Sequence, residues 1–136
     1  MINFRKAKAF HLKVGKTGED AAAKLLESKK MEILARNYKC ARGEIDIVAR
    51  DGANLVFVEV KTRSIDSNAR PSEGLLPKQR NRIFNAALKY LNEIENPSVI
   101  YRFDFVEVIT KRLSIKRIAH WPEHFTGFDS WKKTRS

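Results

Sequence analysis

Two apolar runs separated by a turn signal dominate the middle of this chain. Residues 44–50 and 54–61 are rich in Ile, Val, Leu and Phe, and Asp51-Gly52 stands between them. An Asp-Gly pair between two such runs is a strong signal for a β-hairpin. Ionisable side chains interrupt both runs: Glu44, Asp46, Glu59 and Lys61. The fold must therefore place charged groups inside its most clearly predicted strands.

Helix and strand signals on either side of the hairpin complete a simple order of elements. Thr17 with Asp20 resembles an N-cap pair, and the apolar spacing that follows predicts a helix to about Lys29. Pro77 suits the first turn of a second helix, which Pro97 ends. The predicted strands cover 31–39, 44–50, 54–61, 99–109 and 113–119. The order αβββαββ predicts an α/β (α+β) domain with a central mixed sheet flanked by helices.

The length and the charge limit the domain organisation and the type of partner. A chain of 136 residues predicts a single core. Lys and Arg number 27 against 16 Asp and Glu, a net charge of +11, which favours a polyanionic partner. The basic residues define an N-terminal arm, 1–13, and a basic and aromatic C-terminal tail, 121–136, around a domain at 14–120. The other interpretation is a solvated basic surface that maintains solubility.

The single cysteine and the absence of a long apolar stretch indicate the compartment. Cys40 has no second cysteine to pair with, which favours a reducing environment. The N-terminal residues lack the apolar core of a signal peptide, and no stretch reaches membrane-spanning length. A membrane anchor in residues 1–13 would have only a weak apolar face. We expect a soluble, cytoplasmic protein with no membrane partner.

The hairpin should gather its four charged side chains on one face. Side chains alternate along a strand, so Glu44 and Asp46 share a face of the first strand, and Glu59 and Lys61 share a face of the second. A two-residue loop at Asp51-Gly52 would place Glu44 opposite Glu59, whereas a four-residue loop, 51–54, would place Asp46 opposite Glu59. Both registers leave the charged groups together. The other face of the first strand should carry Ile45, Ile47 and Ala49.

Asp46 and Glu59 would then lie close enough to bind one ligand. Opposed cross-strand Cβ atoms are about 4.5 to 5.5 Å apart, so a divalent metal, Lys61 or a bound proton must offset the repulsion between two carboxylates. Mg²⁺ takes oxygen ligands of this kind, and the lack of His or Cys nearby argues against zinc. The alternative is a solvated hairpin face with Lys61 pairing Glu59. Leu55 and Phe57 on the same face indicate instead that the face is covered.

Asp46 followed by Glu59-Val60-Lys61 resembles the PD-(D/E)XK nuclease signature, with Ile45 in place of the proline. A longer set of motifs resembles the YraN-like family of uncharacterised bacterial proteins, and the match runs from about Val14 to Val108. These motifs are Gly18-Glu19, Arg36-Asn37-Tyr38, Gly43-Glu44-Ile45-Asp46, residues 57–63 and Arg102-Phe103-Asp104. The chain is also similar to archaeal Holliday junction resolvases. The resemblance implies a restriction-endonuclease-like fold.

The same resemblance implies phosphodiester hydrolysis with Mg²⁺ or Mn²⁺ as cofactor. Asp46 and Glu59 would bind the metal with the Val60 carbonyl as a further ligand, Lys61 would orient or deprotonate the attacking water, and Glu19 would complete the site. Two residues are expected in supporting roles, Glu44 and Gln79. Contacts to nucleic acid are expected from Thr62, Arg63, Lys78, Arg80 and Arg82.

Four further residues are considered outside the candidate site. Arg102 and Asp104 share a strand face and are predicted to pair with each other. His120 and His124 have the spacing of a zinc site on a helix, but Pro122 between them argues against one.

Two classes of function follow from the sequence. The first is a metal-dependent endonuclease of DNA repair or recombination, with DNA favoured over RNA and with branched or single-stranded substrates as candidates. Cutting both strands of a duplex would call for a homodimer. The second is a non-catalytic nucleic-acid-binding module that acts with a partner protein. The complete set of Asp46, Glu59 and Lys61 favours the first, because binding alone does not need all three. A purely structural interaction protein fits the charge least well.

Overall fold

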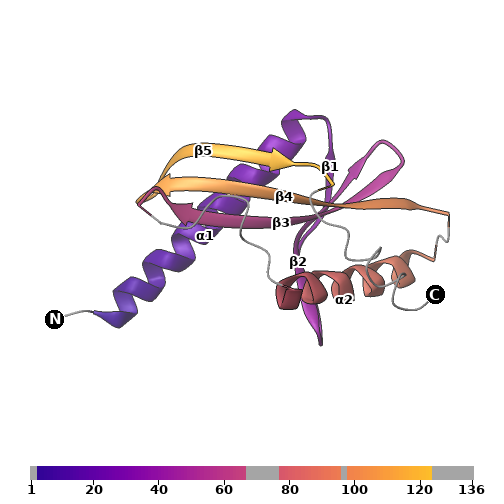
Figure 1. The fold of residues 1–136 in the computed structure, drawn as a ribbon, viewed down its shortest axis with the longest axis horizontal. Helices are drawn as coiled ribbons and strands as arrows, with labels where there is room; N and C mark the ends of the chain where they lie inside the picture. The colour runs from indigo at the N-terminus through magenta and orange to yellow at the C-terminus, as the bar shows by residue number, and fades with distance from the viewer. Residues whose placement is uncertain (1–2, 67–76, 96–97, 124–136) are drawn as a thin grey trace.

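The chain forms one mixed sheet with a helix on each side (Figure 1). The computed structural model describes residues 3–66, 77–95 and 98–123. The elements are α1 (Phe4–Ser28), β1 (Glu32–Cys40), β2 (Gly43–Asp51), β3 (Asn54–Ser64), α2 (Pro77–Ile94), β4 (Ile100–Lys111) and β5 (Ser114–Trp121). This order confirms the predicted fold class.

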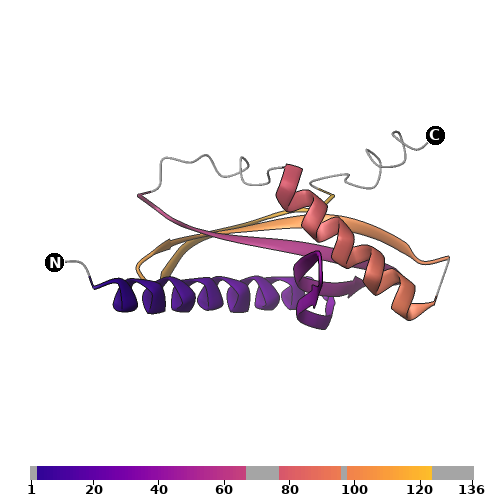
Figure 2. The same cartoon turned by 90° about the horizontal axis from the view of Figure 1, so that it is seen from below.

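The sheet combines antiparallel hairpins with one parallel pair. Its strand order within the described residues is β1-β2-β3-β4-β5. Strands β3 and β4 are parallel, and all other neighbours are antiparallel. Parallel neighbours need a crossover connection, and α2 lies in the connection between β3 and β4. Figure 2 shows α1 running along one side of the sheet and α2 crossing the other.

Two apolar clusters attach the helices to the two faces. On one face, Ala22 and Leu26 of α1 pack with Val58 of β3. On the other face, Ile83 and Ala87 of α2 pack with Phe57, the residue before Val58 in the same strand. A strand that is apolar on both sides is therefore covered on both sides, as the sequence of β3 predicted.

Helix α1 begins earlier than the sequence predicted. Asn3 is the N-cap, and its side chain accepts a hydrogen bond of 3.1 Å from the Lys6 amide. The predicted start at Thr17 was wrong, because the Thr17 hydroxyl donates to the Lys13 carbonyl (2.9 Å) inside the helix. Residues 4–13, predicted as an arm, are helical, and this end of α1 projects beyond the sheet (Figure 1). No helix in the described part of the chain is long and apolar enough to cross a membrane.

The β2–β3 hairpin adopts the register in which Asp46 faces Glu59. Asp51 pairs with Asn54, so the turn consists of Gly52 and Ala53 rather than Asp51-Gly52. Gly52 has φ +62°, a left-handed conformation that glycine adopts without a steric penalty. The ladder runs back from this turn to Ile47 and Val58, and its continuation places Asp46 opposite Glu59. This is the register of the longer-loop alternative.

Side-chain alternation breaks in β2 at Asp46. Ile45 packs with Val48 on the α2 side, whereas Ile47 packs on the α1 side, so the predicted common face of Ile45 and Ile47 was wrong. Across the ladder, Asn37 of β1 has φ 53°, a left-handed conformation. An irregularity of this kind rotates a strand locally and redirects the side chains on either side of it. The sheet is therefore distorted where the acidic pair begins.

Two glycines permit close packing of the helices around this region. A Cβ at Gly18 would overlap the Thr62 hydroxyl, so α1 lies directly on β3. A Cβ at Gly43 would overlap the Arg82 carbonyl oxygen, so the start of β2 lies directly on α2. The positions of Glu19 and Arg82 relative to the hairpin thus depend on residues without side chains.

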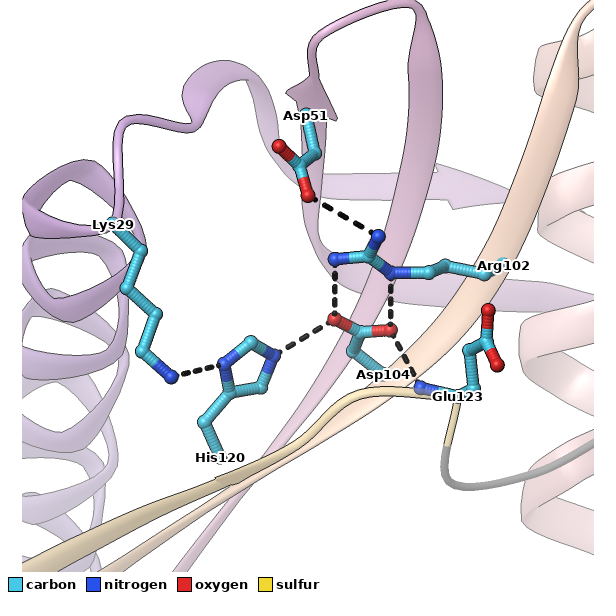
Figure 3. Close-up of polar contacts among 6 residues, drawn as sticks. All are labelled: Lys29, Asp51, Arg102, Asp104, His120 and Glu123. Carbon is cyan, nitrogen blue, oxygen red and sulfur yellow. Dashed lines mark hydrogen bonds and ion pairs between the residues drawn. The ribbon is translucent and has the colours of Figure 1, made fainter.

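A buried polar network closes the α1 side of the sheet (Figure 3). Asp104 of β4 is fully buried and accepts hydrogen bonds from Arg102 Nε (3.0 Å), His120 Nε2 (2.7 Å) and the Glu123 amide (3.0 Å). The predicted pairing of Arg102 with Asp104 is confirmed. Lys29 donates to His120 Nδ1 (2.7 Å), so the neutral ring carries its proton on Nε2. His124, the partner of His120 in the rejected zinc site, lies outside the described residues.

The network joins four separate parts of the chain through one carboxylate. Arg102 also pairs with Asp51 (3.2 Å) beside the hairpin turn, and Lys29 follows the last residue of α1. Burial alone raises the pKa of Asp104, but hydrogen bonds from His120, the Glu123 amide and Arg102 outweigh it and lower the pKa below its usual value. The stability that Asp104 contributes is thus present at neutral pH and lost as the pH falls through its lowered pKa.

The contact between Gly43 and α2 can be tested by a matched pair of glycine substitutions. Gly43→Ala should lower the free energy of unfolding by about 1–3 kcal/mol, because a backbone carbonyl cannot move aside without shifting α2. Gly15→Ala in α1, where a Cβ would meet nothing within 4 Å, should raise it by about 0.5–1 kcal/mol. Urea unfolding measures both. Equal stability of Gly43→Ala and wild type would contradict the close approach.

Candidate active site

The charged residues of the hairpin meet side chains from α2 around one pocket. The pocket has a volume of about 250 Å³. Its lining residues are Glu44 of β2, Glu59 and Lys61 of β3, and Gln79, Arg82 and Ile83 of α2. Five of these six side chains are polar or charged, so the pocket is suited to a polar or ionic ligand rather than an apolar one.

Asp46 connects β2 to β3 through its side chain. Its Oδ2 accepts a hydrogen bond of 2.8 Å from the Val60 amide. The backbone pairs between the two strands extend only as far as Ile47 and Val58. The carboxylate thus replaces a backbone acceptor just beyond the end of the ladder. This bond fixes Asp46 beside Glu59 and Val60.

The Asp46 and Glu59 carboxyl groups share a proton. Burial, the charge of Asp46 and a hydrogen bond to Asp46 raise the pKa of Glu59 to about 9. Burial also raises the pKa of Asp46, against the lowering effect of the Val60 amide and of the hydrogen bond from Glu59. Glu59 is therefore the protonated member and donates to Asp46 at neutral pH. The pair carries one negative charge where two ionised groups would carry two.

A third acid approaches from α1. The pKa of Glu19 is raised first by burial and then by the charge of Asp46, while Arg36 acts in the opposite direction. Glu19 Oε1 is buried and has no hydrogen-bond partner among the described residues. An unpartnered buried carboxylate oxygen is costly, and a cation or a donor group would relieve that cost. The site therefore attracts positive charge from three acids on three elements.

The remaining predicted site residues lie at different places. Thr62 and Arg63 belong to β3 and not to a loop, and Thr62 contacts Gly18. Lys78 and Arg80 begin α2 with Gln79 and Arg82 but do not line the pocket. The structure thus brings together Glu44, Glu59, Lys61, Gln79 and Arg82 in the pocket, with Asp46 and Glu19 beside them.

The donor set fits a hard divalent cation with several water ligands. No three Asp, Glu, His or Cys side chains within 3–66, 77–95 and 98–123 form a metal cage by themselves. Mg²⁺ seldom needs one, because it usually binds through one or two carboxylates and keeps water in the other positions. Asp46 and Glu59 supply two carboxylates, and the unpartnered Glu19 oxygen supplies a third acceptor nearby.

Comparisons with known proteins establish the family. The sequence model of the uncharacterised protein family UPF0102 matches residues 18–108. This chain belongs to the UPF0102 family. A UPF0102 protein of Parafrankia sp. is 43% identical over 108 residues, which cover 79% of this chain and 92% of that protein. A UPF0102 protein of Chlorobium limicola is 39% identical over 122 residues, 89% of this chain and 94% of that protein. One from Syntrophus aciditrophicus is 45% identical over 101 residues, 74% and 80% of the two chains.

The predicted YraN-like resemblance is thus confirmed, and UPF0102 belongs to the restriction-endonuclease-like superfamily. The matched segment begins at Gly18, next to Glu19, and ends at Val108. It contains the acidic pair and Lys61, and it leaves out residues 4–17 of α1 and strand β5. The UPF0102 segment therefore contains the pocket.

Two residues near the site were missed in the sequence. Ile83 of α2 lines the pocket beside the charged groups. In the sequence it fits the apolar face of an amphipathic helix, and that pattern does not indicate a position at the pocket. Glu107 of β4 is 1% exposed and pairs in register with Lys61. An acid between Val106 and Val108, in an otherwise apolar run, was the signal that could have identified it.

The shared proton predicts an unusual pH dependence for the metal-free protein. Because the pKa of Glu59 is raised from 4.5 to about 9 on folding, the folded state holds a proton that the unfolded chain releases. The contribution of Glu59 to the stability of the folded protein should be greatest below pH 4.5. It should decrease above that pH and be lost as the pH rises through about 9. Glu59→Gln, a neutral mimic, should remove most of this decline and raise the free energy of unfolding at pH 8 by about 1–3 kcal/mol.

Thermal or urea unfolding between pH 5 and 9 in EDTA measures the effect. Glu27→Gln on the exposed side of α1 makes the same chemical substitution away from the acidic pair and should retain the wild-type pH dependence. If Glu59→Gln and wild type lose stability in parallel between pH 5 and 9, the two carboxyl groups do not share a proton.

Proposed function

We propose that this protein is a metal-dependent endonuclease that hydrolyses phosphodiester bonds in DNA. The proposal rests on one observation: two half-buried carboxyl groups, Asp46 and Glu59, sit beside Lys61 at a polar pocket. Acids placed together at a cost in free energy, with a lysine next to them, suit a site that binds a cation and an anion together. A phosphodiester with a divalent metal is such a pair.

Mg²⁺ or Mn²⁺ would be held by Asp46 and Glu59, with the Val60 carbonyl as a further ligand and Glu19 acting directly or through a water. When bound, the metal supplies charge neutralisation at the phosphate and lowers the pKa of a coordinated water. The acidic pair must release its shared proton before both carboxylates can bind the metal. The positive charge of the ion favours this release because it lowers the pKa of the pair.

Other side chains around the pocket would orient the attacking water and bind the phosphate. Lys61 lines the pocket next to Glu59 and would orient the attacking water or stabilise negative charge on the phosphate. Glu44 lines the same pocket and would position Lys61 or a water. Gln79 and Arg82 approach from α2, where Arg82 would contact a phosphate oxygen. Asp46 accepts a hydrogen bond from the Val60 amide, which would keep its carboxyl group in place.

The net charge of +11 supports a nucleic acid as substrate, and we favour DNA. Phosphate contacts outside the pocket would come from Thr62 and Arg63 of β3 and from Lys78 and Arg80 of α2. Branched or single-stranded DNA and a role in repair or recombination are part of the proposal. So is a cytoplasmic location, which the unpaired Cys40 favours. A monomer with a single active site would nick one strand, and a homodimer would be needed to cut both strands of a duplex.

A second candidate is a nucleic-acid-binding module that acts with a partner protein and does not cut. One observation favours it: Glu59 and Asp46 already neutralise half of their charge by sharing a proton. An acidic pair that is stabilised by a proton does not need a metal, and without a metal the protein would bind DNA but not hydrolyse it. The two candidates differ in whether the acidic pair is needed for activity.

Cleavage assays with matched variants separate the two candidates. Wild type should cut at least one of supercoiled, single-stranded and four-way-junction DNA in Mg²⁺ or Mn²⁺ and not in EDTA. Glu59→Gln and Lys61→Ala should each lower the rate at least about 100-fold, because each removes a charge that acts on the reacting phosphate. Gel electrophoresis of labelled substrates measures the rates.

Glu27→Gln, exposed on α1, is the control for contaminating nuclease and should cut like wild type. All variants are purified in parallel, with RNA of the same sequences as a second substrate class. Equal cleavage by wild type and Glu59→Gln would identify a contaminant. Binding without cleavage by any of the proteins would favour the non-catalytic module.

A further inference from the structure

A buried acid that the proposed chemistry does not use lies next to Lys61. Glu107 of β4 pairs in parallel register with Lys61 of β3 and is 1% exposed. Paired residues of neighbouring strands point to the same face, and Glu59, Lys61 and Arg63 share a face by alternation along β3. Glu107 therefore lies on the face of the sheet that carries the pocket.

Arg63 is the near partner of this acid. Its Nε lies 3.3 Å from Glu107 Oε2, and the two side chains are 14% and 1% exposed. Neither atom makes a well-aligned hydrogen bond among the described residues, so charge attraction holds the pair together. A guanidinium has five N–H donors, and the contact with Glu107 is made at Nε. The buried acid thus restrains the direction of the Arg63 side chain.

Arg117 of β5 completes the group from the other side. It pairs across the ladder with Ile109, which pairs with Arg63, so the three residues form one row on the same face. Arg117 is exposed, and its charge acts on Glu107 in the same direction as that of Arg63. Two further exposed basic residues, Lys111 and Arg112, lie at the end of β4 and in the β4–β5 turn.

The stability of the fold does not account for an acid at position 107. Buried ion pairs can often be replaced by apolar residues at no cost or with a gain in stability. The neighbours of Glu107 on β4, Val106 and Val108, are residues of that kind, although they face the α1 side. Holding an arginine in a fixed direction does account for it, because a buried carboxylate restricts the guanidinium that pairs with it.

The spacing of the cations suits a nucleic-acid strand. The Cα atoms of Lys61 and Arg63 are two residues apart on a strand, about 6.6 Å, and those of Arg63 and Arg117 are two strand spacings apart, about 9.6 Å. Phosphates of one DNA strand advance by about 3.4 Å per nucleotide along the helix axis. The three cations would therefore span a few successive nucleotides, starting at the pocket.

We propose that Arg63 and Arg117 form a phosphate-binding site next to the pocket, and that buried Glu107 positions Arg63 within it. The site guides the strand from Lys61 across β4 toward the β4–β5 turn. The proposal rests on the nucleic-acid ligand of the proposed function and does not depend on catalysis. Glu107 is a positioning residue, since it acts through Arg63.

Binding measured in EDTA tests the site independently of cleavage. The probe is fluorescently labelled single-stranded DNA or a four-way junction, and anisotropy is recorded over a range of salt concentrations. Arg117→Ala and Arg63→Ala should each weaken binding about tenfold and reduce the slope of log K against log salt by about 1. Lys24→Ala removes the same charge from the outer side of α1 and should change affinity less than about twofold.

Glu107→Gln separates positioning from simple charge attraction. It makes the protein more positive, so a surface that attracts DNA by charge alone would bind more tightly. The proposal predicts weaker binding by about threefold or more, and no further loss when the change is made in Arg63→Ala. Arg63→Lys should also bind more weakly, because an ammonium cannot form the planar fork of the guanidinium.

The outcomes distinguish this site from the proposed catalysis. If wild type binds DNA but cuts none, the proposed nuclease function is wrong. The binding comparison of the Arg63, Arg117 and Glu107 variants with wild type still tests this site. Tighter binding by Glu107→Gln, in a variant that circular dichroism shows to be folded, would overturn the positioning role. Equal effects of Arg117→Ala and Lys24→Ala would overturn the site, as would wild type that binds no nucleic acid.

Discussion

The pair of carboxyl groups at Asp46 and Glu59 is the constraint around which the site is organised. Burial and mutual repulsion make two negative charges there unfavourable, and the pKa of Glu59 rises to about 9 as a result. The metal-free pair meets the constraint with a shared proton. Glu19 adds a third acid, whose buried Oε1 has no hydrogen-bond partner within the described residues. The fold thus keeps three acidic side chains together, and this cluster favours a bound proton or cation although the net charge of the protein is strongly positive.

The rest of the structure maintains that arrangement. The hairpin register places Asp46 opposite Glu59, and the Val60 amide holds Asp46 where the ladder ends. Packing at Gly18 and Gly43 sets α1 and α2 directly against the hairpin strands, one on each face. On the α1 side, Asp104 joins the end of α1, the hairpin turn and the end of β5. These contacts connect the elements that carry the candidate site residues.

The fold class followed from periodicity, since β2 and β3 are apolar runs around a turn and α2 is amphipathic. The errors have local physical causes. Thr17 was taken for a cap because its type favours caps, but its hydroxyl bonds within the helix. Ile45 was assigned by strict alternation, which fails where Asn37 is left-handed. Glu107 was overlooked because its importance depends on the parallel register with Lys61, a long-range pairing that local pattern does not specify.

Metal binding by the intact protein tests the central claim most directly. Isothermal titration of Mn²⁺ into metal-free protein at pH 8 should give one strong site per chain. Asp46→Asn should weaken it at least about tenfold, because it removes one of two carboxylate ligands. Exposed Glu27→Gln should bind like wild type. If wild type takes up no Mn²⁺, or if Asp46→Asn binds it as strongly as wild type, the acidic pair is not a metal site.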